Sequence, residues 1–182
     1  AGPALVVAPP AVVGNWAAEA RRFTPDIKTL VHHGPSRADG SDLKSAIRSA
    51  DLVITTYGTA VRDIDDLSSL QWDRVVLDEA QVIKNHRSAT AKELRKLQAR
   101  SRLALTGTPI ENGLGDLWAI MDFCNPGLVG GRTSFIDQLN QIGDAQGAAE
   151  SALHTLNGVL VFRRTKAEPL IAAELPDRID EL

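Results

Sequence analysis

Two acidic residues follow directly after an apolar run in the middle of the sequence. Residues 75–77 (Val-Val-Leu) are typical of a buried strand, and Asp78 and Glu79 come immediately after them. In open parallel sheets, ligands bind at the carboxyl ends of the strands, which is where both carboxylates would emerge. The first carboxylate can hold Mg²⁺ through water, and the second can orient or deprotonate an attacking water. The structural alternative, a strand that merely ends in two surface acids, is left open by this pattern alone.

A second polar group ends another apolar run. Residues 103–105 lead into Thr106, Gly107 and Thr108, and a proline follows. Threonine hydroxyls can donate and accept at once, glycine permits a close backbone approach, and proline fixes the turn. An ordinary strand-to-loop turn would use the same residues. If the two groups form one site, Asp78 and Thr106 must lie at the same edge of the sheet.

The elements that would position these residues alternate along the first half of the chain. Expected strands cover residues 5–8, 29–31, 52–55, 74–77 and 102–106; expected helices cover 12–23, 41–50 (capped by Ser41 or Asp42), a short stretch from 57, and 88–98. Continuous apolar strands separated by helices indicate an α/β fold with a mostly parallel sheet covered on both faces. Later residues are mostly helical, at 114–124, 134–142 and 148–156, and an apolar run at 159–162 ends in Arg163 and Arg164.

Composition excludes several classes of protein. The 182 residues are 43% hydrophobic and carry a net charge of −3, as in ordinary globular proteins and unlike a general nucleic-acid-binding basic protein. No apolar run approaches membrane-spanning length, so we expect no membrane partner. The lone Cys124 cannot form an internal disulfide, which favours a reducing compartment; we interpret it as inert core.

Other residues with chemical potential have plainer interpretations. His32, His33, His86 and His154 show no metal-ligand spacing and are expected on the surface or in loops. Trp16, Trp72 and Trp118 are interpreted as packing residues. A basic stretch is either a solvated helix or a phosphate-facing surface; it contains Lys84, Arg87, Lys92, Arg95, Lys96, Arg100 and Arg102.

Several motifs in order resemble those of one family, the SWI/SNF-type (HepA/RapA-like) ATPases of helicase superfamily two. Asp-Glu-Ala-Gln at 78–81 followed by Leu-Thr-Gly-Thr-Pro-Ile-Glu-Asn at 105–112 resembles its motifs II and III. The remaining matches are Leu-Val-Val-Ala-Pro at 5–9 with Val-Gly-Asn-Trp at 13–16, Val-Ile-Thr-Thr-Tyr at 53–57, Ile-Lys-Asn at 83–85, Phe-Arg-Arg-Thr-Lys at 162–166 and Glu-Leu-Pro at 174–176. The resemblance covers nearly the whole chain.

The resemblance implies a RecA-like three-layer α/β/α lobe that binds ATP and Mg²⁺. Residues 1–160 would form the partial first lobe with its helical extension, and 161–182 would lead toward a second lobe. Asp78 would hold the magnesium through water and Glu79 would be catalytic. Gln81 would join this catalytic set and, with Thr106, Gly107 and Thr108, couple the nucleotide to the DNA side.

The resemblance also implies a double-stranded DNA partner and, beyond it, protein complexes bound to nucleic acid. The residues implied to contact nucleic acid are Pro9, Asn15, Thr55, Thr56, Tyr57, Lys84, Arg163 and Arg164. Helix N-termini and hydroxyl groups bind phosphate oxygens without reading sequence. Localisation would follow the DNA: the bacterial cytoplasm with the nucleoid, or the nucleus of a eukaryote.

One component of such an ATPase is missing from the sequence. No Gly-Lys dipeptide occurs, so the phosphate-binding loop with its G-K-[ST] signature is absent. We interpret the chain, which starts at Ala1, as an internal piece that is inactive alone, with the loop upstream. Its sheet should lack the phosphate-loop strand beside the motif III strand, so the apolar edge should either promote self-association or be filled by another segment. The alternatives are a non-catalytic nucleic-acid- or protein-binding module of the same shape, and a different phosphate-loop enzyme.

Overall fold

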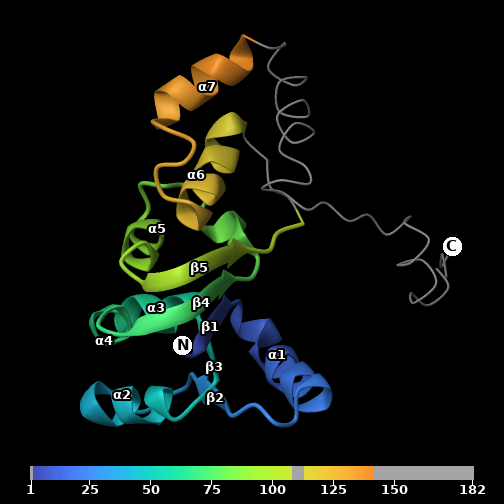
Figure 1. The fold of residues 1–182 in the computed structure, drawn as a ribbon, viewed down its shortest axis with the longest axis vertical. Helices are drawn as coiled ribbons and strands as arrows, with labels where there is room; N and C mark the ends of the chain where they lie inside the picture. The colour runs from blue at the N-terminus through green and yellow to red at the C-terminus, as the bar shows by residue number, and fades with distance from the viewer. Residues whose placement is uncertain (1, 108–112, 142–182) are drawn as a thin grey trace, which may run out of the picture. The chain divides into compact units, whose positions relative to one another are not determined.

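The computed structural model describes residues 2–107 and 113–141, and its strands and helices alternate along the chain (Figure 1). The elements are β1 (Ala4–Ala8), α1 (Pro10–Phe23), β2 (Thr29–His32), α2 (Gly40–Arg48), β3 (Leu52–Thr56), α3 (Tyr57–Arg62), α4 (Ile64–Ser68), β4 (Gln71–Leu77), the 3₁₀ helix η1 (Ala80–Ile83), α5 (Ala89–Leu94), β5 (Gln98–Ala104), α6 (Leu114–Cys124) and α7 (Arg132–Asn140).

The strands form one five-stranded sheet in the order β2-β3-β1-β4-β5. Every pairing is parallel, which confirms the predicted sheet. The carboxyl ends are level, because Ala8 pairs with Thr56 and Leu77 pairs with both Val7 and Ala104. The residues that follow these strands therefore leave the sheet at one common edge.

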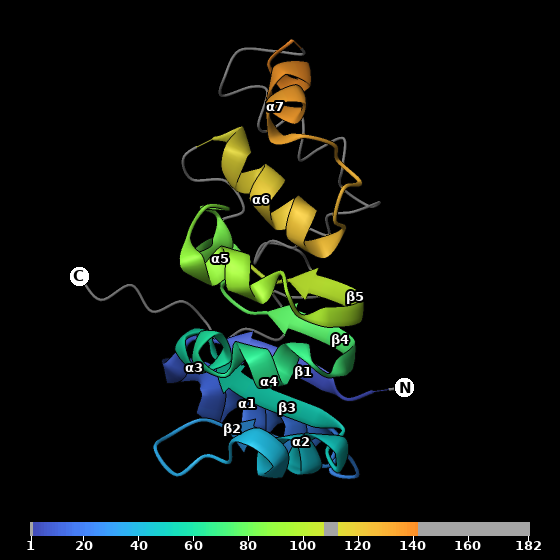
Figure 2. The ribbon, with the colours of Figure 1, turned by 90° about the vertical axis from the view of Figure 1, so that its left-hand side faces the viewer.

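Side chains of the central strand β1 alternate between two apolar clusters. Leu5 and Val7 belong to the larger cluster, which includes residues of α2, α3, α4, α5 and η1. Val6 and Ala8 belong to a smaller cluster with residues of α1. The helices thus cover opposite faces of the sheet, with α1 on one side and α3, α4 and α5 on the other (Figures 1 and 2). Because both faces are buried, the strand is apolar at every position rather than at alternate ones.

Strands β4 and β5 begin earlier than the sequence predicts. Pairing already starts between Gln71 and Gln98, although the apolar patterns begin only near residues 74 and 102. Strand β5 lies at the edge of the sheet and none of its residues is fully buried. A half-exposed strand tolerates polar residues, so hydrophobicity marks only its last part.

Two helix predictions need correction. The expected helix 88–98 ends at Leu94, because the following residues turn into the longer strand β5. Helix α2 begins at Gly40, and neither Ser41 nor Asp42 caps it. The backbone N–H of Gly40 instead donates to the Asp66 carboxylate at 3.1 Å, a contact distant in sequence that replaces the local cap.

The three tryptophans have different environments. Trp72 is fully buried and donates its indole N–H to the Leu67 carbonyl at 2.9 Å, which confirms the packing prediction. Trp118 is half-buried on α6, where it lies edge-on to His86 and donates to the Gly130 carbonyl. Trp16 is also half-buried and packs in the smaller cluster, but its indole has a further polar contact described below.

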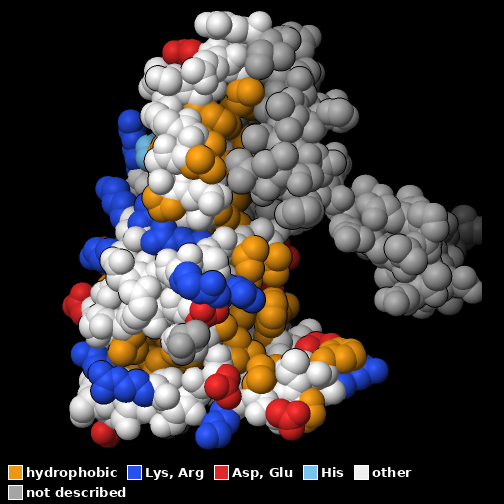
Figure 3. Space-filling view, in the orientation of Figure 1, with side chains coloured by type: hydrophobic (Ala, Val, Ile, Leu, Met, Phe, Trp, Pro, Cys, Tyr) orange, Lys and Arg blue, Asp and Glu red, His pale blue; other side chains and the backbone are white. Residues whose placement is uncertain are grey.

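An apolar edge is exposed where the phosphate-loop strand was predicted to be missing. Strand β5 pairs with β4 on one side, and within residues 2–107 and 113–141 no strand pairs with its other side. Leu103 and Leu105 are 46% and 43% exposed. Figure 3 shows hydrophobic side chains open to solvent over the region where β4 and β5 end. Self-association through this edge stays a prediction.

Two remaining predictions concern the domain boundary and membrane-spanning helices. Residues up to Gln138 form one compact unit, and the predicted boundary near residue 160 lies outside the described part. None of the described helices has the length and apolar character needed to cross a lipid bilayer.

Candidate nucleotide site

The ends of β1, β4 and β5 are joined by backbone hydrogen bonds that continue past the strands. The N–H of Asp78 donates to the Val7 carbonyl at 2.9 Å, and the N–H of Leu105 donates to the Leu77 carbonyl at 2.8 Å. The N–H of Ala80 then donates to the Leu105 carbonyl at 2.9 Å. These bonds bring residues 78–81 beside 105–107, so the two polar groups of the sequence lie at one edge, as predicted.

Glu79 turns the chain at this edge in an unfavourable backbone conformation. Its φ of 51° makes it the one non-glycine residue with positive φ among the described residues. A left-handed conformation costs an ordinary residue roughly 1–2 kcal/mol, and glycine would remove most of that cost. Glu79 is nevertheless exposed. A strained residue with an exposed carboxylate makes Glu79 a candidate site residue.

A chain of hydrogen bonds joins this carboxylate to the end of β5. The Gln81 amide N–H donates to Glu79 Oε2 at 2.6 Å, and the Thr106 hydroxyl donates to Gln81 Oε1 at 2.8 Å. The amide of Gln81 is therefore oriented from both ends. Sequence analysis placed Glu79, Gln81 and Thr106 in one site but did not predict which of them are in contact.

The Asp78 carboxylate is held by two neutral donors. The indole N–H of Trp16 donates to Oδ2 at 2.8 Å, and the backbone N–H of Glu79 donates to Oδ1 at 3.0 Å. The Tyr57 hydroxyl donates to the Asp78 carbonyl at 2.7 Å. Burial, and then the nearby charges of Asp78 and Glu79, raise the Tyr57 pKa, so the hydroxyl keeps its proton.

This arrangement fits a hydrated magnesium ion. Each carboxylate oxygen has about two lone-pair sites, and each uses one for the bonds just described, so each retains one acceptor position. No ion pair joins Asp78 to another described residue. Among the described residues no group of three or more His, Cys, Asp or Glu could hold a metal alone. Mg²⁺ typically uses one or two carboxylates together with water and substrate phosphates, so Asp78 would be its protein partner.

Thr55, Thr56 and Tyr57 were predicted to face phosphates, but their hydroxyls point inward. The Thr55 hydroxyl donates to the His32 carbonyl at 2.8 Å, and the Thr56 side chain accepts from the Thr59 N–H and caps α3. All of these side chains are buried. These side chains therefore have hydrogen-bond partners inside the protein, and the role of the three residues in nucleic-acid binding stays a prediction.

The other predicted nucleic-acid contacts are spread over several places. Pro9 is the N-cap of α1 at the same edge as Asp78, and Asn15 is exposed on that helix. Lys84 is half-buried directly after η1. Thr108, Arg163 and Arg164 lie outside the described residues.

The basic stretch is not a single solvated helix. Arg95 pairs with Asp122 on α6, and Arg102 donates to the carbonyls of Leu97 and Phe123. Arg100 pairs with Asp73 across β4 and β5. Three of the seven basic residues thus contact neighbouring elements of the fold, and a phosphate-facing role for the others stays a prediction. Near it, burial raises the pKa of Cys124 to about 11, in agreement with an inert thiol.

A cluster of the half-buried Arg37 and Asp63 with the buried His32 was not predicted. His32 is only 2% exposed, which corrects its expected surface position, and its Nε2 lies 2.8 Å from Asp63 Oδ2. Arg37 contacts both Asp63 oxygens, at 2.6 and 2.8 Å. The partners are more than 25 residues apart in sequence, and no local motif signals them.

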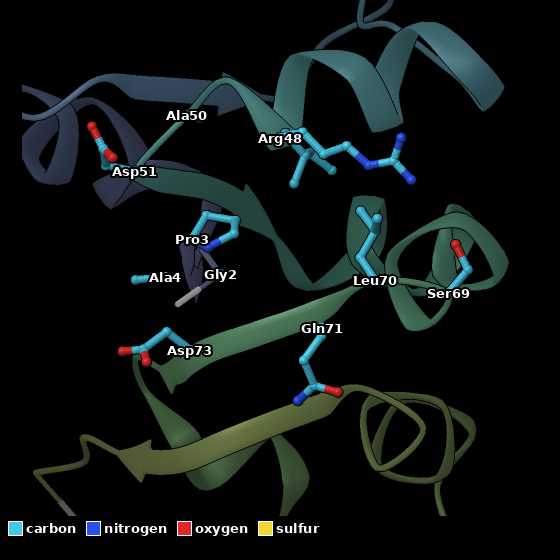
Figure 4. A pocket seen from close by; sticks show the side chains of 11 residues that line it. Gly2, Pro3, Ala4, Arg48, Ala50, Asp51, Ser69, Leu70, Gln71 and Asp73 are labelled. Carbon is cyan, nitrogen blue, oxygen red and sulfur yellow. The ribbon is translucent and has the colours of Figure 1, made fainter.

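A cavity of about 720 Å³ lies away from Asp78. It opens at the amino-terminal end of the sheet, where Arg48, Asp51, Gln71 and Asp73 are among the residues that line it (Figure 4). Ligands of parallel sheets bind at the opposite, carboxyl end. The candidate site is therefore an open surface at the strand tips and not this cavity.

Comparisons with known proteins agree with this geometry. The SNF2-related domain family matches residues 1–182. The putative ATP-dependent helicase/translocase YwqA of Bacillus subtilis is 39% identical over 98% of this chain, which spans 20% of that protein. The ISWI chromatin-remodeling complex ATPase ISW2 of Saccharomyces cerevisiae is 33% identical over 92% of this chain, which spans 15% of it.

A solved structure shows the same fold. The Sulfolobus solfataricus SWI2/SNF2 ATPase core in complex with dsDNA matches 96% of this chain and 36% of its own, with 36% identity and a TM-score of 0.77. The predicted RecA-like lobe is thereby confirmed. A family match over the full chain and a close structural match lead to the same conclusion: the chain belongs to the SNF2-related domain family.

Proposed function

We propose that the chain is part of the first motor lobe of an ATP-dependent translocase on double-stranded DNA that remodels bound protein complexes. The observation that carries the proposal is the continuous contact from Glu79 through Gln81 to Thr106, with Asp78 held beside it. Such a chain links a site for the nucleotide to the tip of the neighbouring strand. The comparison with a SWI2/SNF2 core in complex with dsDNA supports the choice of DNA.

Each residue has a distinct part in this proposal. Asp78 accepts hydrogen bonds from the water shell of Mg²⁺, which neutralises phosphate charge when it is bound. Glu79 orients or deprotonates the attacking water, and its exposed position leaves it accessible. Gln81 donates to the Glu79 carboxylate and accepts from the Thr106 hydroxyl, so a movement of Glu79 would also move Thr106. A change of nucleotide state would thus reach the end of β5.

The duplex backbone is proposed to meet the same edge. The N-terminus of α1 at Pro9 presents backbone N–H groups, and helix N-termini attract phosphate. The exposed side chain of Asn15 and the side chain of Lys84 after η1 would add contacts. We also propose that the protein works where its DNA is, in the bacterial cytoplasm or in a nucleus.

Substitution of Glu79 tests the proposal in the complete protein that carries this sequence. Glu79→Gln should reduce DNA-stimulated ATP hydrolysis by at least about 100-fold, because general base catalysis contributes about 10²–10⁴-fold. Binding of a fluorescent ATP analogue should persist. Glu93→Gln is the matched control, because that carboxylate pairs with Lys96 at the surface of α5 and should leave turnover unchanged.

The same assay separates the alternative functions. A protein that binds DNA but never hydrolyses ATP would be a binding module that retains the motor shape. Unchanged turnover in Glu79→Gln would remove Glu79 from the catalytic role. We also expect residues 1–182 alone to hydrolyse no ATP, because they contain no Gly-Lys dipeptide and so no phosphate-binding loop.

A further inference from the structure

Two aromatic residues from other elements hold Asp78 in place. Trp16 of α1 donates to the Asp78 carboxylate, 62 residues away in sequence, and Tyr57 at the start of α3 donates to its carbonyl, 21 residues away. The strand itself supplies a third anchor, the bond from the Asp78 N–H to Val7. The carboxylate, the carbonyl and the N–H of this residue are thus fixed from three directions.

The donors orient Asp78 without offsetting its charge. The carboxylate accepts from the indole N–H of Trp16 and a backbone N–H, the backbone carbonyl accepts from a phenol, and none of these donors carries a charge. An arginine or lysine in their place would compensate that charge and compete with the ion. Neutral anchoring is the arrangement expected for a group that must bind a hydrated cation in a defined position.

Both donors are firmly held in their own elements. Trp16 packs in the small cluster with Val13 and Ala17 of α1, and Tyr57 is only 9% exposed within the large core. A shift of either helix would therefore move its donor. Because both donors bind Asp78, a movement of either helix would also move Asp78.

These helices are the ones that face the proposed duplex. Helix α1 begins just after Pro9, and α3 begins at Tyr57 itself, at the level edge of the sheet. We propose that Trp16 and Tyr57 are positioning residues that couple these two helices to the Asp78 carboxylate. This inference rests on the proposed function, because it assumes that Asp78 acts on the magnesium of a bound nucleotide and that the helices contact DNA.

The test removes one hydrogen-bond donor at a time from the complete protein. Trp16→Phe deletes the indole N–H and keeps an aromatic ring, and Tyr57→Phe deletes only the hydroxyl. Affinity for a non-hydrolysable ATP analogue is titrated against Mg²⁺, with and without duplex DNA, alongside ATP turnover. Trp118→Phe is the matched control, because its indole N–H donates to the Gly130 carbonyl and not to Asp78.

We expect each variant to need about tenfold more Mg²⁺ for half-maximal analogue binding, since outer partners of metal ligands contribute about 10–100-fold. The gain in analogue affinity on adding DNA should shrink, whereas Trp118→Phe should behave like the parent protein. If Trp16→Phe fails to fold, benzothienylalanine at position 16 keeps the shape of the indole, replaces the N–H by sulfur, and should give the same shift.

Distinct outcomes overturn the inference and the proposed function. Magnesium dependence and DNA coupling equal to those of Trp118→Phe would reduce Trp16 and Tyr57 to packing residues, while DNA-stimulated turnover of the parent protein would leave the motor assignment intact. A parent protein that binds no nucleotide at any magnesium concentration would overturn both.

Discussion

Asp63 and Asp78 are both half-buried residues, but the partners of their carboxylates differ in charge. Asp63 lies between α3 and α4 and is surrounded by the Arg37 guanidinium and the His32 imidazole. Asp78 lies at the end of β4 and accepts from a neutral indole N–H and a backbone N–H. The Arg37 hydrogen bonds, with a smaller contribution from His32, lower the Asp63 pKa. One carboxylate is compensated within the protein and the other is left charged.

The charge of the hydrogen-bond partners distinguishes a structural aspartate from a candidate functional one better than the burial of the side chain does. A compensated carboxylate has its charge offset within the protein, so its main contribution is to the fold. An uncompensated one is oriented but still requires a cation. If this interpretation is correct, changes at Asp78 affect nucleotide chemistry and leave stability intact, whereas changes at Asp63 do the reverse.

The largest expected effect is at Asp78. Asp78→Asn keeps an oxygen that can accept from Trp16 but removes the charge, so ATP turnover of the complete protein should fall by about 100-fold at moderate magnesium. The free energy of local unfolding, from native-state hydrogen exchange of β4, should change by no more than about 0.5 kcal/mol. A marked loss of protection in β4 would place Asp78 among the structural aspartates.

The second effect is at Asp63. Asp63→Ala removes the shared partner of Arg37 and His32, and we expect the free energy of local unfolding around β2 and α3 to fall by about 2 kcal/mol. Hydrogen exchange of these elements measures it. Asp73→Ala is the matched control, because its partner Arg100 is 71% exposed and the pair should contribute little to stability. Equal losses of stability in Asp63→Ala and Asp73→Ala would show that the Asp63 cluster contributes no more to stability than a pair with an exposed partner.

Sequence reasoning was accurate where a structural feature depends on consecutive residues. The parallel sheet followed from apolar runs, and Asp78, Glu79 and Thr106 followed from their places at strand ends, since a strand end is a local property of the sequence. Helix and strand limits were less accurate near β5, because an edge strand need not be apolar along its length.

Contacts distant in sequence were not accessible in this way. Trp16 fits the spacing of an apolar helix face, and nothing in that spacing shows that its N–H reaches a carboxylate 62 residues later. His32 directly follows the expected strand 29–31, and only the fold brings Arg37 and Asp63 to it. A polar side chain at the buried end of a strand was the one available signal for such a cluster.

The smallest expected effect is a change of stability with pH, which tests how much the charge of Asp63 contributes. Because the folded-state pKa of Asp63 is lowered, its stabilisation is complete above the unfolded-state pKa, about 3.9, and is lost as pH falls through the folded value. The stability difference between the parent protein and Asp63→Asn should therefore shrink as pH falls below about 4. Hydrogen exchange of α3 across this range measures the difference, with Asp78→Asn as the control, whose difference from the parent should stay small throughout. A difference for Asp63→Asn that did not shrink in acid would mean that shape rather than charge compensation holds this cluster, and the contrast between the two aspartates would lose its physical basis.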